Sequence, residues 1–178
     1  MNTKQHRVNV ILAFSSLLAA LSIILGKYLA FNVGEFLRFS FENLPTIFAA
    51  IAFGPVTALL VATVADVVGS LMVGYAINPI LTVGAAFVGA VAGLVNIPVS
   101  KLKLPSALKI AICVFSAHIA GSLIIKSIGL HLMYGTPYSV LVPWRALNYL
   151  IVGTLETVIL TILISNKAIK KIITETKI

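Results

Sequence analysis

The chain has 178 residues, of which 60% are hydrophobic and only 10% are charged, and its mean hydropathy is +1.09. A soluble domain usually carries about a quarter of its residues as charged side chains, which keep its surface hydrated. This composition therefore excludes an ordinary soluble protein and predicts an integral membrane protein whose surface mostly faces lipid. The formal net charge of +8 must then be explained within a membrane protein.

Six apolar blocks separated by short gaps predict an all-α, six-transmembrane-helix bundle that forms one domain over residues 1–178. A helix needs about 20 apolar residues to cross the hydrocarbon core, and lipid offers no partner to an open backbone. The second block is short and must be tilted, extended backwards or shielded by protein, and Gly54-Pro55 separates it from the third. In chain order, the blocks are residues 8–31, 44–53, 56–75, 79–99, 107–130 and 142–165.

Three groups of basic residues near the ends of the blocks predict the orientation. They gather before the first block, between the fourth and fifth, and after the sixth, which six spans place on one side of the membrane. The positive-inside rule assigns that side, and therefore both termini, to the cytoplasm. We read the net charge as a topology signal and expect no nucleic-acid binding, because the bases are split among three segments. These bases are Lys4, Arg7, Lys101, Lys103, Lys109, Lys167, Lys170, Lys171 and Lys177.

Enzymatic signatures are missing from the sequence. It has no P-loop, no GxSxG and no HExxH, and its three histidines lack the spacing of metal ligands. We expect no catalytic residues, no metal site and no cofactor. His118 is expected to pack between helices or to line a cavity. Because nothing in the chain can hydrolyse ATP, uphill transport would need energy from a partner or an ion gradient.

Five ionisable residues in or near the blocks suggest a binding site. A charge inside a membrane span costs about 2.5–3.5 kcal/mol on insertion scales and usually serves a function. Asp66 lies in the third block, Glu156 in the sixth and Lys126 near the outer end of the fifth. Arg38 precedes the second block and Arg145 opens the sixth. The predicted topology makes these cations an outer mouth above a carboxylate floor. Alternatively, the arginines anchor helix ends to lipid headgroups and the carboxylates hydrogen-bond between helices.

Aromatic and polar side chains surround the same predicted mouth. An interfacial aromatic belt would account for some of the aromatic side chains, but the turn-rich loop 134–138 points tyrosines across the mouth. Arg145, Asn148 and Tyr149 share one helical face, which suits a flat aromatic ligand bearing carboxylates. We expect the cations to hold the carboxylates, the aromatics to sandwich the ring, and the amide and acid to read its polar edge. The predicted substrate-binding residues are Arg38, Asp66, Lys126, Tyr134, Tyr138, Trp144, Arg145 and Asn148.

Two helices carry small residues at the spacing that lets membrane helices approach closely. The first block has Ser15, Ser16, Ala19 and Ala20, and the fourth has Gly84, Gly89 and Gly93 among alanines. One of these surfaces is expected to close the bundle, and the other to dock a partner protein.

The chain resembles the substrate-binding S components of energy-coupling factor (ECF) vitamin transporters, and within them most closely the folate-specific branch. The segments that carry the likeness are residues 38–45, 53–55, 65–69, 134–138 and 143–148. The resemblance implies a multi-pass protein of a prokaryotic cell membrane that binds a vitamin, folate above others, at the outer face with high affinity. It also implies two kinds of partner, a transmembrane coupling subunit and two cytoplasmic ATPase subunits. The coupling subunit would dock at Ser15, Ser16, Ala19 and Ala20, and the S component would topple within the lipid during transport.

Two other readings stay open at this point. An S component for thiamine, riboflavin, pantothenate or a queuosine precursor would also use a mixed aromatic and polar mouth. A stand-alone ion-coupled carrier would use Asp66 or Glu156 as its proton-binding carboxylate, although the sequence shows no repeat and only the Gly54-Pro55 break. A membrane-embedded enzyme is disfavoured because no nucleophile–base pair is found.

Overall fold

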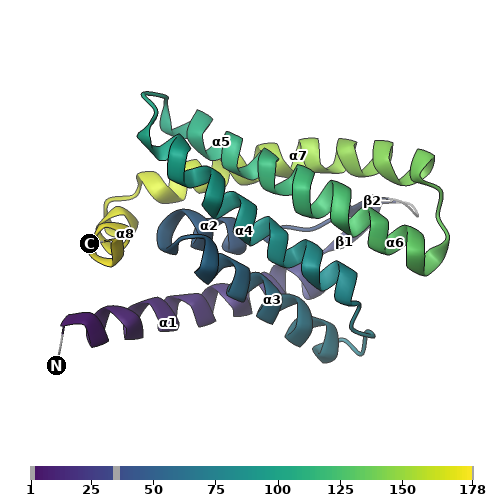
Figure 1. Cartoon of the computed structure of the whole chain (residues 1–178), viewed down its shortest axis with the longest axis horizontal. Helices are drawn as coiled ribbons and strands as arrows, with labels where there is room; N and C mark the ends of the chain where they lie inside the picture. The colour runs from purple at the N-terminus through teal and green to yellow at the C-terminus, as the bar shows by residue number, and fades with distance from the viewer. Residues whose placement is uncertain (1–2, 34–36, 178) are drawn as a thin grey trace.

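Long apolar helices build the protein, and a small hairpin interrupts them near the start of the chain (Figure 1). The structure, a computed structural model, describes residues 3–33 and 37–177. Its elements are α1 (Thr3–Ile23), the π-helix η1 (Ile24–Tyr28), β1 (Phe31–Val33), β2 (Leu37–Phe39), α2 (Asn43–Phe53), α3 (Pro55–Met72), α4 (Pro79–Lys101), α5 (Ser106–Ala117), the π-helix η2 (His118–Ile125), α6 (Lys126–Tyr134), α7 (Tyr138–Ser165) and α8 (Lys167–Lys177).

Among residues 3–33 and 37–177, five helical segments are long and apolar enough to cross a membrane, whereas the sequence predicts six spans. The second block forms α2, which has only 11 residues and is therefore only about 16 Å long. Nine of its residues are buried inside the bundle, which fits the expectation that a short second block is shielded by protein. The five segments are Gln5–Tyr28, Pro55–Met72, Pro79–Lys101, Ser106–Tyr134 and Tyr138–Ser165.

Proline, glycine and asparagine set two of the helix boundaries. Gly54 separates α2 from α3 with a φ of 93°, a value that glycine tolerates, and Pro55 then starts α3. The Asn78 side chain caps α4 by accepting hydrogen bonds from the backbone N–H groups of Ile80 (2.8 Å) and Leu81 (3.3 Å).

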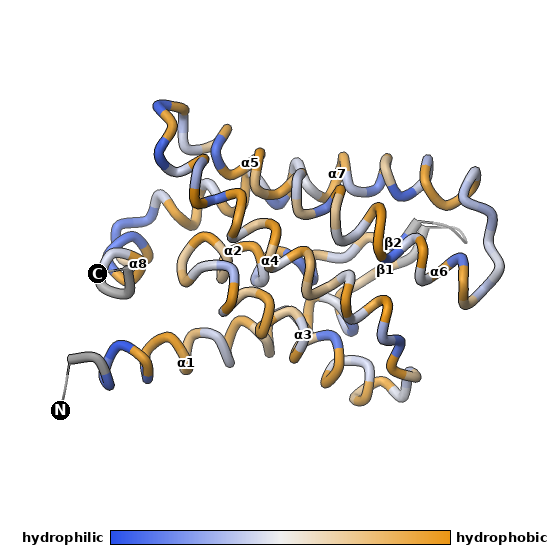
Figure 2. Tube along the Cα trace, in the orientation of Figure 1, coloured by the Kyte–Doolittle hydropathy of each residue, from blue (hydrophilic) through white to orange (hydrophobic). Residues whose placement is uncertain are grey.

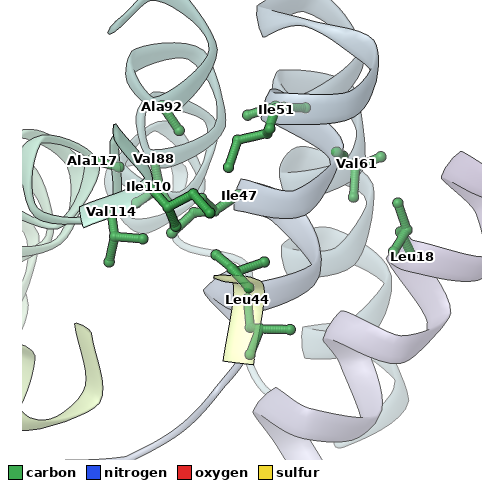
Figure 3. Close-up of a cluster of buried hydrophobic side chains, with 14 of the residues drawn as sticks. Leu18, Leu44, Ile47, Ile51, Val61, Val88, Ala92, Ile110, Val114 and Ala117 are labelled. Carbon is green, nitrogen blue, oxygen red and sulfur yellow. The ribbon is translucent and has the colours of Figure 1, made fainter. Parts of the chain in front are cut away.

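The hydrophobic core surrounds α2 (Figure 3). Ile47 of α2 is fully buried, and side chains of α1, α3, α4 and α5 converge on the same cluster. The glycines of α4 bring neighbouring backbones close together. A Cβ atom at Gly89 would lie only 2.5 Å from the carbonyl oxygen of Ala58 in α3, and one at Gly121 would lie 2.5 Å from the carbonyl oxygen of Gly84. The small-residue face of the fourth helix therefore closes the bundle.

A short antiparallel hairpin is added to the predicted helices. Phe31 of β1 pairs with Phe39 of β2, and Asn32 pairs with Arg38. The rings of Phe31 and Phe39 stack with their centroids 5.4 Å apart. Each strand has only three residues, and so short an alternation of side chains gives no clear strand signal in a sequence. The hairpin holds Arg38 over the end of the bundle.

The three predicted basic regions meet at one end of the bundle. The start of α1, the connection between α4 and α5, and α8 all lie there, and the hairpin and the connection between α6 and α7 lie at the other end (Figure 1). Hydrophilic residues lie at this basic end in Figure 2, and others lie near the opposite end. The last basic region is not a simple tail, since it folds as α8, whose Ile173 is buried.

Candidate substrate-binding site

A cavity of about 590 Å³ opens at the end of the bundle that carries the hairpin. Its walls come from β2, α3, α6 and α7, and Asn43, the first residue of α2, lies in its lining. The volume falls within the range of about 300–1,000 Å³ that is usual for small-molecule sites. The short α2 thus leaves room for a cavity of ligand size between the longer helices.

The structure brings seven of the eight predicted substrate-binding residues together around this cavity. They are Arg38, Asp66, Lys126, Tyr134, Trp144, Arg145 and Asn148. The segments that carry these residues lie far apart in the sequence. Asn148, for example, donates a hydrogen bond of 2.6 Å to the backbone carbonyl of Arg38, which is 110 residues earlier. That these residues bind a substrate remains a prediction.

Tyr138 is the exception. It is missing from the cavity lining, and its ring packs against His131 with the centroids 4.2 Å apart. The loop before it consists only of residues 135–137, and the Nδ1 atom of His131 is 2.9 Å from the carbonyl oxygen of Thr136. This bond holds the loop against α6, so Tyr138 begins α7 beside His131 and does not reach across the mouth as predicted.

An ion pair lies in the cavity. The Nζ atom of Lys126 is 2.8 Å from Oε1 of Glu42, and Lys126 is only 8% exposed. Glu42 precedes α2, outside the five membrane-crossing segments. Burial alone would raise the pKa of Glu42, but Lys126, Arg38 and Lys27 overcome that effect and lower its pKa to about 2.

The predicted arrangement of a cationic mouth above an acidic floor is corrected by this pair. Lys126, one of the cations predicted to form the mouth, is buried beside the carboxylate of Glu42, whereas Arg38 is exposed, so the cations and the carboxylates are not separated into a mouth and a floor. The sequence reasoning missed Glu42 and Lys27. Glu42 stands in the segment 38–45 that carries the family resemblance, which was the signal available for it.

Hydrogen bonds hold the other charged groups of the cavity. The Arg38 guanidinium donates to the carbonyl of Gly26 at 2.6 Å, and Lys27 donates to the hydroxyl of Ser70 at 3.2 Å. Asp66 accepts a hydrogen bond of 2.7 Å from the Thr82 hydroxyl. These bonds fix the charged groups without a ligand, which lowers the ordering cost of binding one.

Arg145 is held by two acceptors. Its Nη2 donates to the carbonyl of Ser122 at 2.6 Å and to the hydroxyl of Tyr149 at 2.9 Å. The Nε atom is buried and has no hydrogen-bond partner within the described part of the chain. A guanidinium held in this way at the cavity lining suits an anionic ligand group.

The charges of the cavity do not balance. Four cationic side chains face it, from Lys27, Arg38, Lys126 and Arg145, against the carboxylates of Glu42 and Asp66, which gives a net charge of +2 among the described lining residues. Three aromatic side chains (Tyr75, Tyr134 and Trp144) are exposed along its lining. The site can therefore hold a flat ring between aromatic groups and an anionic group among its cations.

Glu156 lies outside this cavity lining. It bonds His118 across two helices, with Oε2 of Glu156 2.6 Å from Nε2 of His118. Glu156 thus makes a hydrogen bond between helices, which was one of the roles considered for it from the sequence, and His118 is buried between these helices.

The proposed docking face on α1 is divided by the structure. Ala19 is 7% exposed and packs in the hydrophobic core, and the Ser15 hydroxyl oxygen is buried. Ser16 and Ala20 are exposed on the outer surface. Residues 15 and 19 therefore face the bundle, and only residues 16 and 20 remain available to a partner.

Comparisons with known proteins bear on the fold. No model of a known protein family matches the sequence, and no curated protein matches it. Solved structures of other proteins are similar to it, among them the following two. One is FolT bound with folic acid, with a TM-score of 0.66 and 24% sequence identity over 83% of this chain and 88% of that one. The other is the S component of a bacterial ECF transporter, with a TM-score of 0.64 and 22% identity over 87% of this chain and 95% of that one. This chain therefore has the fold of the S components of ECF transporters.

Proposed function

We propose that this protein is the high-affinity substrate-binding subunit of an ECF vitamin importer and that its vitamin is folate. The observation that carries the proposal is the cavity of about 590 Å³, with its net charge of +2 and its exposed aromatic side chains. The folate-bound structure of FolT, which shares the fold, supports the same ligand.

The chemistry of folate matches this cavity at both ends. Its glutamate end carries two carboxylates, which would offset the net charge of +2, and arginine's planar fork pairs with a carboxylate through two bonds. Its pterin ring presents an amino group beside a ring N–H, two parallel donors that the single carboxylate of Asp66 can accept together. Trp144 and Tyr134 would stack on the ring system. Arg145, with Arg38 or Lys126, would hold the glutamate.

The proposed function predicts a specific order of affinities. Folate is expected to bind the purified protein at least tenfold more tightly than pteroate, which has the same rings but lacks the glutamate. Thiamine and riboflavin are expected not to compete. Calorimetric titration in detergent measures all four compounds. If thiamine bound and folate did not, both the folate assignment and the anion-binding role of the arginines would be wrong.

The proposal also includes the orientation of the chain. The basic end would face the cytoplasm of a prokaryotic cell, since a net excess of Lys and Arg marks that side. Single cysteines are introduced by Thr136→Cys and Lys170→Cys after Cys113→Ala removes the native thiol. A membrane-impermeant maleimide applied to intact cells is expected to label residue 136, and to label residue 170 only after permeabilisation. The reverse pattern would invert the topology.

The importer would further need a transmembrane coupling subunit and two cytoplasmic ATPases. We place the coupling subunit against the outward face of α1, where Ser16 and Ala20 are exposed. Ala20→Trp is expected to abolish folate uptake by cells and to change the affinity of the isolated protein less than twofold, because a wedge at a close helix contact acts on association. Ile162→Trp, at an exposed apolar position of α7, is the matched control. Equal uptake in both variants would contradict this docking surface.

A further inference from the structure

A polar pair is buried deep in the bundle, outside the cavity lining. Glu156 of α7 is 0% exposed and His118 of η2 is 1% exposed. Their side chains meet at 2.6 Å. Such groups are rare inside membrane proteins and usually serve a function.

This pair is connected to the cavity through one side chain. The His118 ring stacks on the Tyr149 ring, with the centroids 4.7 Å apart and the planes 24° apart. The Tyr149 hydroxyl accepts the hydrogen bond of Arg145, whose guanidinium carbon lies 5.3 Å from the centre of the same ring. Both Tyr149 and Arg145 line the cavity. A continuous path of contacts therefore runs from Glu156 through His118 and Tyr149 to Arg145.

Each link of the path restricts the next one. The carboxylate fixes the plane of the imidazole, as carboxylates do for functional histidines elsewhere. A fixed imidazole gives Tyr149 a flat surface against which its ring cannot turn freely. The fixed hydroxyl and the Ser122 carbonyl then hold Nη2 of Arg145 from two sides, which leaves the buried Nε–H without a partner in the described structure.

We propose that Glu156 and His118 form a positioning pair for Arg145. Acting through Tyr149, the pair holds the guanidinium of Arg145 in place at the cavity wall, where it can pair with an anionic group of the ligand. The ligand part of this inference rests on the proposed function, but the ordering of Arg145 does not. If the pair served only to link η2 to α7, replacing one of its members would leave the ordering of the Arg145 side chain unaffected.

The ordering of Arg145 is testable without any ligand. The chain has three arginines, Arg7, Arg38 and Arg145, so the Nε–H region of a ¹⁵N-arginine NMR spectrum is simple, and the Arg145→Ala variant assigns its signal. The wild type is expected to give a sharp, slowly exchanging Arg145 signal. His118→Leu removes both the ring and the bond and is expected to broaden the signal, whereas Glu156→Gln, which keeps a hydrogen bond, is expected to preserve it. His118→Phe retains a ring and replaces the leucine variant if that variant does not fold.

Binding measurements then ask whether the pair acts through Arg145. His118→Leu is expected to weaken folate binding about tenfold and Glu156→Gln less than threefold. In the Arg145→Ala background, His118→Leu is expected to change the affinity less than twofold. An unchanged Arg145 signal in His118→Leu, or a tenfold loss that persists without Arg145, would overturn the proposal. If folate binds none of these proteins, the proposed ligand is wrong, and the NMR comparison alone decides whether the pair positions Arg145.

Discussion

Replacing Arg145 with alanine is expected to weaken folate binding between about 30-fold and several thousand-fold, because removing one partner of a buried charge pair costs about 2–5 kcal/mol. The variant deletes a guanidinium that lines the cavity and is held there by Ser122 and Tyr149. Asp66→Asn is expected to weaken binding well beyond tenfold, since the amide cannot accept two parallel donors with the strength of a carboxylate. Calorimetric titration of folate into each purified variant gives the ratio of affinities.

Two matched controls accompany these variants. Tyr138→Phe alters a predicted residue that packs on His131 away from the cavity lining, and Lys103→Ala removes a charge between α4 and α5, in the basic end of the bundle. Both are expected to bind folate within twofold of the wild type. Folate affinity retained within threefold in Arg145→Ala would show that the ligand anion lies elsewhere.

Lys126→Met is expected to lower both the stability and the folate affinity of the protein. Breaking a buried ion pair by removing one partner costs about 3–5 kcal/mol, and we expect about 2–3 kcal/mol here because Arg38 and Lys27 also stabilise the Glu42 carboxylate. The thermal midpoint in detergent, measured with and without folate, reports the loss.

A double variant separates the two effects. Glu42→Gln/Lys126→Met removes both charges, so that no buried charge is left without its partner. Its thermal midpoint is therefore expected to return most of the way to that of the wild type. Its folate affinity is expected to stay low, because the cation is still missing from the cavity. Recovery of binding along with stability would mean that Lys126 supports the fold alone and does not contact the ligand.

The pH dependence of this pair follows from the pKa of Glu42. That pKa is lowered from 4.5 to about 2, so the stability contributed by the carboxylate is fully present above about pH 5 and is lost as the pH falls toward 2. The thermal midpoint of the wild type is therefore expected not to change through protonation of Glu42 between pH 5 and 8.

Most of the site was predictable because charges are rare in this chain. An ionisable residue in an apolar block is conspicuous, and this signal identified Asp66, Lys126 and Arg145 before any contact was known. It failed for Glu42, which stands in a polar connection where a carboxylate is unremarkable. The ion pair with Lys126 joins residues 84 positions apart, and no local pattern in a single sequence encodes such a pairing.

Small residues and aromatic residues were harder to assign. Ala19 and Ala20 are adjacent on α1, but one lies in the core and the other faces outward. Since alanine suits both environments, the sequence cannot distinguish them, and only the packing of α1 against α2 and α3 does. The predicted position of Tyr138 at the cavity differs from the structure for a similar reason. A tyrosine near the membrane surface can turn toward a cavity or toward a neighbouring ring.

The sequence by itself determined the membrane class, the apolar helices and their breaks, since composition and the local effects of Pro, Gly and Asn require no tertiary contact. The tertiary structure decided what depends on distant parts of the chain meeting. It buried the short second block inside the bundle, paired residues 31–33 with residues 37–39 in a hairpin, and paired Glu42 with Lys126 and Glu156 with His118. These features follow from which side chains share a buried space, and burial is set by the packing of the whole bundle.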